Sequence, residues 1–220
     1  MKARIALFLF LLLAVLPIAA QVQHEYYDNG PVNGTVDGWT INFGYVVSDT
    51  FLETPASTVT GFDFYVWLFP GDTLLTVDWS ITTAEFGGTT LGAGTSPVAQ
   101  TIISSNQYGY DVALAQVRGL GVFQADPGPY WLNLDNAVVN TGDPVYWDEN
   151  SGIGCGGLNG TGQGCPSMAS ESAIGTIPSE AFTIYFDESS GGGTVPEPSS
   201  ILLVASGLLA VGGLLRRKLF

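Results

Sequence analysis

Several segments of the chain alternate apolar and polar residues with a period of two, the pattern of a strand buried on one face. In residues 74–81 the positions that share the inward face are Leu75, Val77, Trp79 and Ile81. Residues 181–186 follow the same pattern, and residues 62–69 are apolar on nearly both faces, as expected of a central strand. Further strands are predicted at residues 23–27, 39–47, 98–104, 111–117 and 130–139.

Turn signals separate these segments, among them Pro70-Gly71 and Gly87-Gly88. No segment between the two chain ends has both the period and the length of a helix. Many short strands at this spacing favour an all-β fold, an antiparallel β-sandwich that is jelly-roll-like.

The first twenty residues predict a secretory signal peptide. Lys2 and Arg4 precede an unbroken apolar run over residues 5–16, and the segment ends in Ala19 and Ala20. The run is shorter than the about 20 residues that cross a membrane. We therefore expect cleavage after Ala20, with an uncleaved anchor as the alternative.

The C-terminal segment predicts a single transmembrane helix over about residues 201–215. A helix cannot run through Pro196 and Pro198, so the apolar helix is expected to begin after them. At the standard rise such a helix measures about 22 Å, short of a hydrocarbon core of about 30 Å. A plain single-span anchor is the alternative to a sorting device.

Cations after this helix predict its orientation. They are Arg216, Arg217 and Lys218, and such clusters stay on the cytoplasmic side of the membrane. The Pro-Glu-Pro tripeptide centred on Glu197 would then lie on the outer face. A plain anchor does not explain a rigid tripeptide at that place.

The end of the chain resembles a PEP-CTERM sorting signal. It has the Pro-Glu-Pro tripeptide, then an apolar helix that contains several glycines, and then a basic end, in this order. The resemblance implies recognition and cleavage by an exosortase, a membrane-embedded cysteine peptidase, in a Gram-negative bacterium that builds an extracellular polysaccharide matrix. The protein would be held in the cytoplasmic membrane by its C-terminal helix until it is processed, and would end in the cell envelope or outside the cell. The resemblance indicates an address and not an activity.

The expected domain organisation follows from these ends. It comprises a signal peptide at residues 1–20, an acidic β-sandwich domain at 21–188, a Gly/Ser linker at 189–195 and a sorting tail at 196–220.

Acidic residues dominate the part of the chain between the targeting ends. Arg118 is the one Lys or Arg in residues 21–195, against 19 Asp and Glu, which gives this segment a formal net charge of −18. This balance excludes binding of nucleic acid through a basic patch, and it disfavours adhesion to anionic lipid. Self-repulsion at such a charge favours solubility.

Both cysteines lie in a long glycine-rich loop over residues 151–168. Cys155 and Cys165 are ten residues apart in an exported chain, which predicts a disulfide between them. A redox or metal pair is the weaker alternative, because the spacing fits neither. A crosslinked loop of this length is also a candidate recognition element.

No catalytic constellation is visible, so we expect no catalytic residues, no enzyme activity and no metal or cofactor site. His24 is the only histidine, and the motifs of serine hydrolases, zinc proteases and phosphate-binding loops are absent. Paired carboxylates could serve a glycosidase, but 19 acids make some pair nearly certain. The densest acid group holds Asp143, Asp148 and Glu149, where a calcium corner is the alternative to a solvated turn.

Aromatic residues give the other functional hypothesis. Tyr65 and Trp67 share a strand face with Asp63, and Trp131 and Trp147 lie beside further amides and carboxylates. If exposed, these four rings are candidate glycan contacts, although buried sheet aromatics are commoner. The leading hypothesis is a non-catalytic cell-surface or matrix protein with an exosortase as partner. Its alternatives are a carbohydrate-binding module for extracellular polysaccharide, with or without calcium, and then a glycoside-active enzyme.

Overall fold

A computed structural model describes residues 25–54, 57–124, 126–150 and 153–188 of the 220-residue chain. The predicted signal peptide, linker and sorting tail lie outside these residues. In the described part of the chain no helix is long and apolar enough to cross a membrane. The described elements are strands joined by turns and loops.

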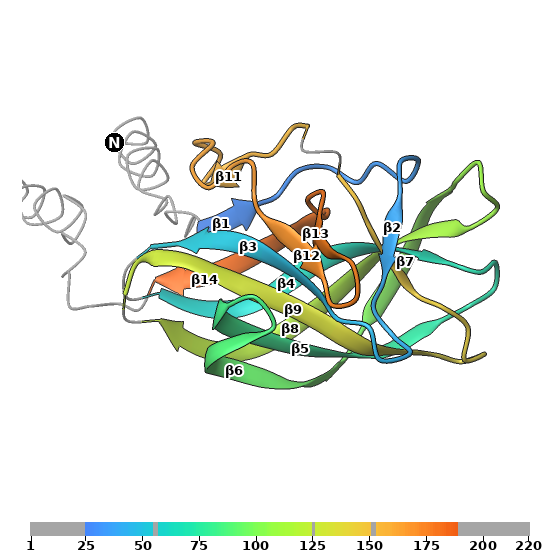
Figure 1. The fold of residues 1–220 in the computed structure, drawn as a ribbon, viewed down its shortest axis with the longest axis horizontal. Coiled ribbons are helices and arrows are strands. Elements are labelled where there is room, and N and C mark those ends of the chain that lie inside the picture. Colours follow the sequence, from blue (N-terminus) through green and yellow to red (C-terminus); the bar gives the residue numbers. More distant parts are fainter. Residues whose placement is uncertain (1–24, 55–56, 125, 151–152, 189–220) are drawn as a thin grey trace, which may run out of the picture. The chain divides into compact units, whose positions relative to one another are not determined.

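Strands follow one another along the whole described segment (Figure 1). They are β1 (Glu25–Asp28), β2 (Gly38–Thr40), β3 (Val47–Glu53), β4 (Ser57–Leu68), β5 (Leu74–Ala84), β6 (Gly87–Pro97), β7 (Ala99–Ser105), β8 (Asp111–Gln124), β9 (Gly128–Val139), β10 (Tyr146–Asp148), β11 (Gly157–Leu158), β12 (Ala169–Glu171), β13 (Gly175–Ile177) and β14 (Phe182–Glu188).

The strands form two antiparallel sheets. Sheet A has the order β11-β1-β14-β4-β10-β2, and β8 pairs with β4 and in turn with β7. Sheet B has the order β13-β12-β3-β9-β5-β6, and Figure 1 shows β3, β9 and β5 side by side in one layer. The chain crosses repeatedly between the sheets, for example from β3 to β4, from β4 to β5 and from β8 to β9. The all-β prediction is therefore confirmed, and the jelly-roll assignment stays a prediction.

Apolar side chains from both sheets meet in one core, which makes the fold sandwich-like. The ring of Phe62 on β4 lies 6.4 Å from that of Trp79 on β5, measured between centroids. The ring of Phe51 on β3 lies 6.3 Å from that of Phe186 on β14. Ring pairs at such separations stabilise a core beyond the area that they bury.

Alternation fails at the start of β5. Leu74 is buried and Leu75 is 45% exposed, the reverse of the prediction for Leu75. The pairing of β5 with β9 shifts register between Leu74 and Asp78, so the bulged strand turns Leu75 outward. Val77, Trp79 and Ile81 point into the core as predicted.

The strand predicted at residues 39–47 is wrong in its centre. The chain turns there, with Phe43 at a φ of 57° and Gly44 at 87°. The N–H of Tyr45 donates to the carbonyl of Asn42 at 3.1 Å, which closes the turn. The segment therefore divides into the end of β2 and the start of β3.

Strand β6 was not predicted, because four glycines lower its β-propensity. The turn before it lies at Glu85 and Phe86 rather than at Gly87-Gly88. Strands β10, β11, β12 and β13 were also missed, and each is only two or three residues long. Strand β3 was missed because the strand predicted at residues 39–47 ends where β3 begins.

Phe182→Ala tests the role of the shared core. Phe182 is fully buried, and its ring lies 5.9 Å from Tyr27 and 5.6 Å from Trp147. Its truncation is expected to lower the free energy of unfolding by about 3 to 5 kcal/mol in urea denaturation followed by circular dichroism. Phe123→Ala is the matched control, since Phe123 is exposed. Equal losses in the two variants would contradict this account of the core.

Candidate ligand-binding face

The outer face of sheet A gathers polar and aromatic side chains from three neighbouring strands. Successive residues of a strand point to opposite faces. Phe62 and Phe64 on β4 point into the core, so Asp63 and Tyr65 point outward. Tyr185 on β14 is the direct cross-strand partner of Tyr26 on β1. Directly opposite residues share a sheet face, so both tyrosines lie on this side.

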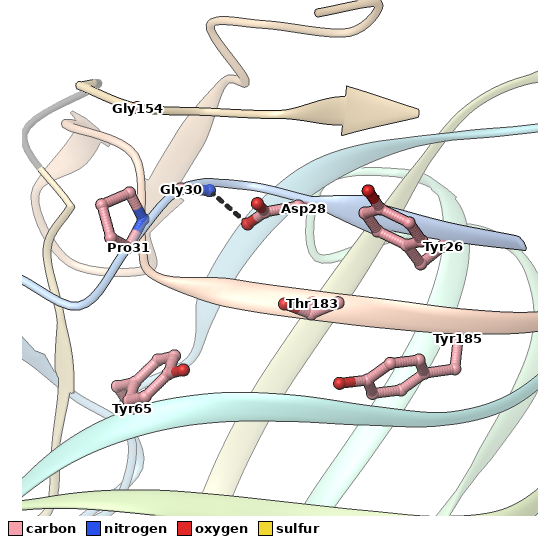
Figure 2. Close-up of a pocket in the computed structure, with 8 residues that line it drawn as sticks. All are labelled: Tyr26, Asp28, Gly30, Pro31, Tyr65, Gly154, Thr183 and Tyr185. Carbon is pink, nitrogen blue, oxygen red and sulfur yellow. Dashed lines mark hydrogen bonds between the residues drawn. The ribbon is translucent and has the colours of Figure 1, made fainter. Parts of the chain in front are cut away.

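These residues line an open groove of about 490 Å³. Its lining residues are Tyr26, Asp28, Gly30, Pro31, Tyr65, Gly154, Thr183 and Tyr185. Figure 2 shows three tyrosine rings around Thr183, with the hydroxyls of Tyr65 and Tyr185 directed toward one another in this view. The groove therefore combines flat aromatic surface with hydroxyl groups.

A charged cluster holds Tyr185 from one side. Its hydroxyl donates to Asp63 Oδ2 at 2.9 Å, and the guanidinium of Arg118 lies 2.5 Å from Asp63 Oδ1. The same guanidinium carbon lies 4.7 Å from the centroid of the Tyr185 ring. Gln116 Nε2 also donates to Asp63, so this carboxylate is fully engaged.

Gly61 makes this arrangement possible. It is the cross-strand partner of Tyr185 on one side and of Arg118 on the other. A Cβ at position 61 would lie 2.5 Å from the carbonyl oxygen of Val117 and 3.1 Å from Cδ of Arg118. The absence of a side chain therefore lets Arg118 reach across to the tyrosine.

Burial affects the pKa of two phenols of the groove, those of Tyr65 and Tyr185. Burial, followed by the hydrogen bond and charge of Asp63, raises the pKa of Tyr185 to about 12. Burial, followed by the charges of Asp63 and Asp28, also raises the pKa of Tyr65. Both hydroxyls stay protonated. That of Tyr185 already donates its proton to Asp63, so it offers a ligand its acceptor lone pairs, whereas the phenol of Tyr65 suits the recognition of neutral acceptor oxygens.

The glycine-rich loop with its disulfide contributes one residue, Gly154, to the groove. Cys155 and Cys165 are bonded, as the sequence predicts, with their Cα atoms 6.1 Å apart. Gly154, next to Cys155, lines the groove together with Pro31, close to which it lies (Figure 2). The N–H of Gly30 donates to Asp28 Oδ1 at 2.9 Å, which fixes the one acidic side chain of the lining.

The structure places the four candidate glycan contacts in three different environments. Trp147 points into the core, where its ring packs edge-on against Phe64 and Phe182. Trp131 is half-buried on the outer face of sheet B, away from Tyr65. Its neighbour Asn133 is buried and bonded to Ser48 and other residues. Of the four, Tyr65 alone lines the groove.

Trp67 lies on the outer face of sheet A but is covered. The ring of Tyr108, from the turn between β7 and β8, stacks on it at 5.7 Å. Its Nε1 donates to Asp148 Oδ1 at 2.5 Å. Burial leaves no free face of Trp67 for a ligand.

Asp148 organises the loop before β2 and is no solvated turn residue. It is fully buried, and its carboxylate accepts the N–H groups of Asn33 and Gly34 at 2.7 and 2.8 Å. Together with Trp67, these donors occupy both oxygens of the carboxylate. Among the described residues no group of three or more His, Cys, Asp or Glu is arranged to hold a metal ion.

A second buried acid, Asp49, links the two sheets. Asp49 lies on β3, and its Oδ2 accepts the N–H of Glu180 at 2.7 Å and Asn29 Nδ2 at 3.0 Å, both from the sheet A side. Burial raises the pKa of Asp49 to about 8. Burial, followed by the charge of Asp49, also raises the pKa of Glu180.

Four groove residues were not predicted as site residues from the sequence, namely Tyr26, Asp28, Thr183 and Tyr185. Alternation in residues 181–186 already places Tyr185 outward, since Phe182, Ile184 and Phe186 point inward. The missing information was the pairing of β14 with β1, whose residues lie more than a hundred positions away along the chain.

A family model matches the end of the chain. Residues 194–218 match the PEP-CTERM protein-sorting motif. The matched range includes Pro196, Glu197, Pro198 and the cations Arg216, Arg217 and Lys218. This match confirms the resemblance to PEP-CTERM proteins and supports an exported bacterial protein sorted by an exosortase through a membrane-anchored signal. No match to the chain was found among curated proteins.

The pKa of Asp49 predicts a pH-dependent stability. Asp titrates at about 3.8 in an unfolded chain, so between about pH 4 and pH 8 the folded protein retains a proton that the unfolded chain has lost. Stability should therefore fall as the pH rises through this window. Asp49→Asn is expected to flatten the fall, measured by urea denaturation across the window. Asp126→Asn, at an exposed acid, should keep the wild-type slope. If the free energy of unfolding fell equally with pH in wild type and in both variants, the raised pKa of Asp49 would not be its cause.

Proposed function

We propose that this protein is a non-catalytic component of the bacterial cell surface or extracellular matrix, exported by its signal peptide and processed by an exosortase. The observation that carries the proposal is the PEP-CTERM motif at residues 194–218. In this proposal a helix over residues 201–215 holds the chain in the cytoplasmic membrane until cleavage near Glu197 releases the folded part. The acidic β-sandwich is the part that acts outside the cell.

The groove supports a non-catalytic role. Hydrolysis of a glycosidic bond uses two carboxyl groups across the substrate, about 5 to 9.5 Å apart. Asp28 is the one acid among the residues that line the groove. Asp63, the cross-strand partner of Thr183 on the same face, is held by Arg118, Tyr185 and Gln116. We also propose the jelly-roll assignment, supported by the alternation of β3, β4 and β5 between the sheets.

A carbohydrate-binding module is the second candidate function, favoured by the tyrosine groove. Aromatic faces pack on the apolar faces of sugar rings, and phenol hydroxyls donate to sugar oxygens. Tyr26, Tyr65 and Tyr185 supply three such rings from three adjacent strands. We assign the candidate contacts to these tyrosines, which replace the covered Trp67 and the buried Trp147.

Charge selects among polysaccharides. A segment with a formal net charge of −18 repels a uronic-acid polymer at low ionic strength. The groove itself presents Asp28 and neutral phenols. The ligand class is therefore an uncharged polysaccharide.

Sorting is tested in a bacterium that encodes an exosortase. Mass spectrometry of the mature protein should find a C-terminus near Glu197 and no peptide containing Arg216–Lys218. Deletion of the exosortase gene, or replacement of Pro196, Glu197 and Pro198 by alanine, should leave the tail attached. An intact tail on mature wild-type protein would overturn the proposal.

Glycan binding is tested by affinity electrophoresis in gels with a neutral β-glucan, a neutral mannan or alginate, with and without calcium. Tyr26→Ala should weaken binding of the neutral polymer about tenfold, equal to about 1.4 kcal/mol. Tyr45→Ala is the control, because Tyr45 is exposed outside the groove. Retardation by no polymer would exclude the module, and release of reducing sugar would replace it with an enzyme.

A further inference from the structure

The edges of the two sheets are of very different lengths. On one side, sheet A ends in the short strands β11 and β2. Sheet B likewise has a short strand, β13, at one edge. Each of these three edge strands is two or three residues long. The opposite edges are β7, with seven residues, and β6, with eleven. Short edge strands limit pairing with other chains, whereas a long edge strand offers a row of N–H and C=O groups.

The long edges also coincide with an uncharged stretch of sequence. Residues 86–110 contain no Lys, Arg, Asp or Glu, although residues 21–195 carry 19 acids. Natural edge strands are commonly protected by charged side chains. This segment lacks that protection, and it is also where two copies of so acidic a protein can approach with least repulsion.

Strand β7 is the better template of the two. Strand β6 is bulged in its pairing with β5, ends in Pro97, and at Gly92 lies so close to Val122 that an added Cβ would be 2.4 Å away. Strand β7 pairs regularly with β8 from Ala99 to Ile102, and its one register shift lies between Ile102 and Ser104. In the described part of the chain, β7 has no strand on its other side.

Apolar side chains on β7 are exposed on this edge. Ile102 is 45% exposed and Ile103 is 44% exposed. The cross-strand partner of Ile102 is Ala113 on β8, which is fully buried. The core therefore covers β8 at this position but leaves β7 exposed. A strand added beyond β7 would remove part of this apolar surface from water, which favours association.

We propose that β7 pairs antiparallel with β7 of a second copy of this chain, continuing sheet A across a two-fold axis. A strand edge is complementary to itself in the antiparallel sense, since each copy offers the same donors and acceptors. Lack of charge on both strands removes the repulsion that the rest of the surface imposes. This interaction goes beyond the proposed function and does not depend on glycan binding.

The association is tested by sedimentation velocity of the full chain in detergent over a range of concentrations. Wild type should form dimers, and higher salt should strengthen them because it screens the acidic surfaces. Ile102→Asp should weaken dimerisation at least tenfold. Val138→Asp is the matched control, because it adds the same charge at a residue 47% exposed on β9, inside sheet B. Urea denaturation of both variants checks that each is folded.

Hydrogen exchange locates the interface. Peptides that cover residues 99–105 should exchange more slowly as the protein concentration rises, and peptides that cover residues 87–97 should not. Protection of β6 in place of β7 would overturn the proposal, as would a monomeric wild type. Dimers that persist in Ile102→Asp would overturn it too, because they would form through another surface such as the tail.

Discussion

Residues 25–188 hold 19 acids and a single arginine, which pairs with Asp63, so the other buried carboxyl groups depend on hydrogen-bond donors or on protonation. Asp148 uses two backbone N–H groups and the Trp67 indole, and Asp49 uses the N–H of Glu180 and the amide of Asn29. Each of these carboxyl groups joins segments that are far apart in the sequence. The raised pKa of Asp49 follows from the same shortage of cations, because burial then favours the protonated form.

The one arginine lies where the outer face of sheet A needs it. Arg118 neutralises Asp63, and Asp63 in turn accepts the hydroxyl of Tyr185. Without the guanidinium, a buried carboxylate would lie beside Thr183 of the groove with neutral donors alone. The groove thus depends on a glycine, Gly61, that admits the arginine, and on the arginine that holds the carboxylate and the tyrosine in place.

Local pattern predicted most of the long strands, because inward and outward residues alternate strictly in segments such as 181–186. It failed where geometry is set by pairing. Leu75 points outward because of a bulge in the pairing of β5 with β9, which the sequence of β5 alone does not reveal. The turn at Phe43 has a left-handed backbone conformation, which the identity of this residue does not predict. The site follows the same division. The position of aromatic residues beside acids and amides suggested glycan contacts, but burial of Trp67 and Trp147 and the pairing of Tyr26 with Tyr185 arise only from tertiary structure.

Edge pairing through β7 and a ligand on the outer face of sheet A would be compatible, because one uses the rim of the sheet and the other its face. Two antiparallel strands in a continuous sheet are related by a two-fold axis perpendicular to that sheet. Such an axis leaves the outer faces of both copies on the same side. Two tyrosine grooves would then face one polymer together, and binding of the second groove would become intramolecular. An open groove that binds weakly alone would in this way gain avidity on a long polysaccharide, without any new contact within either copy.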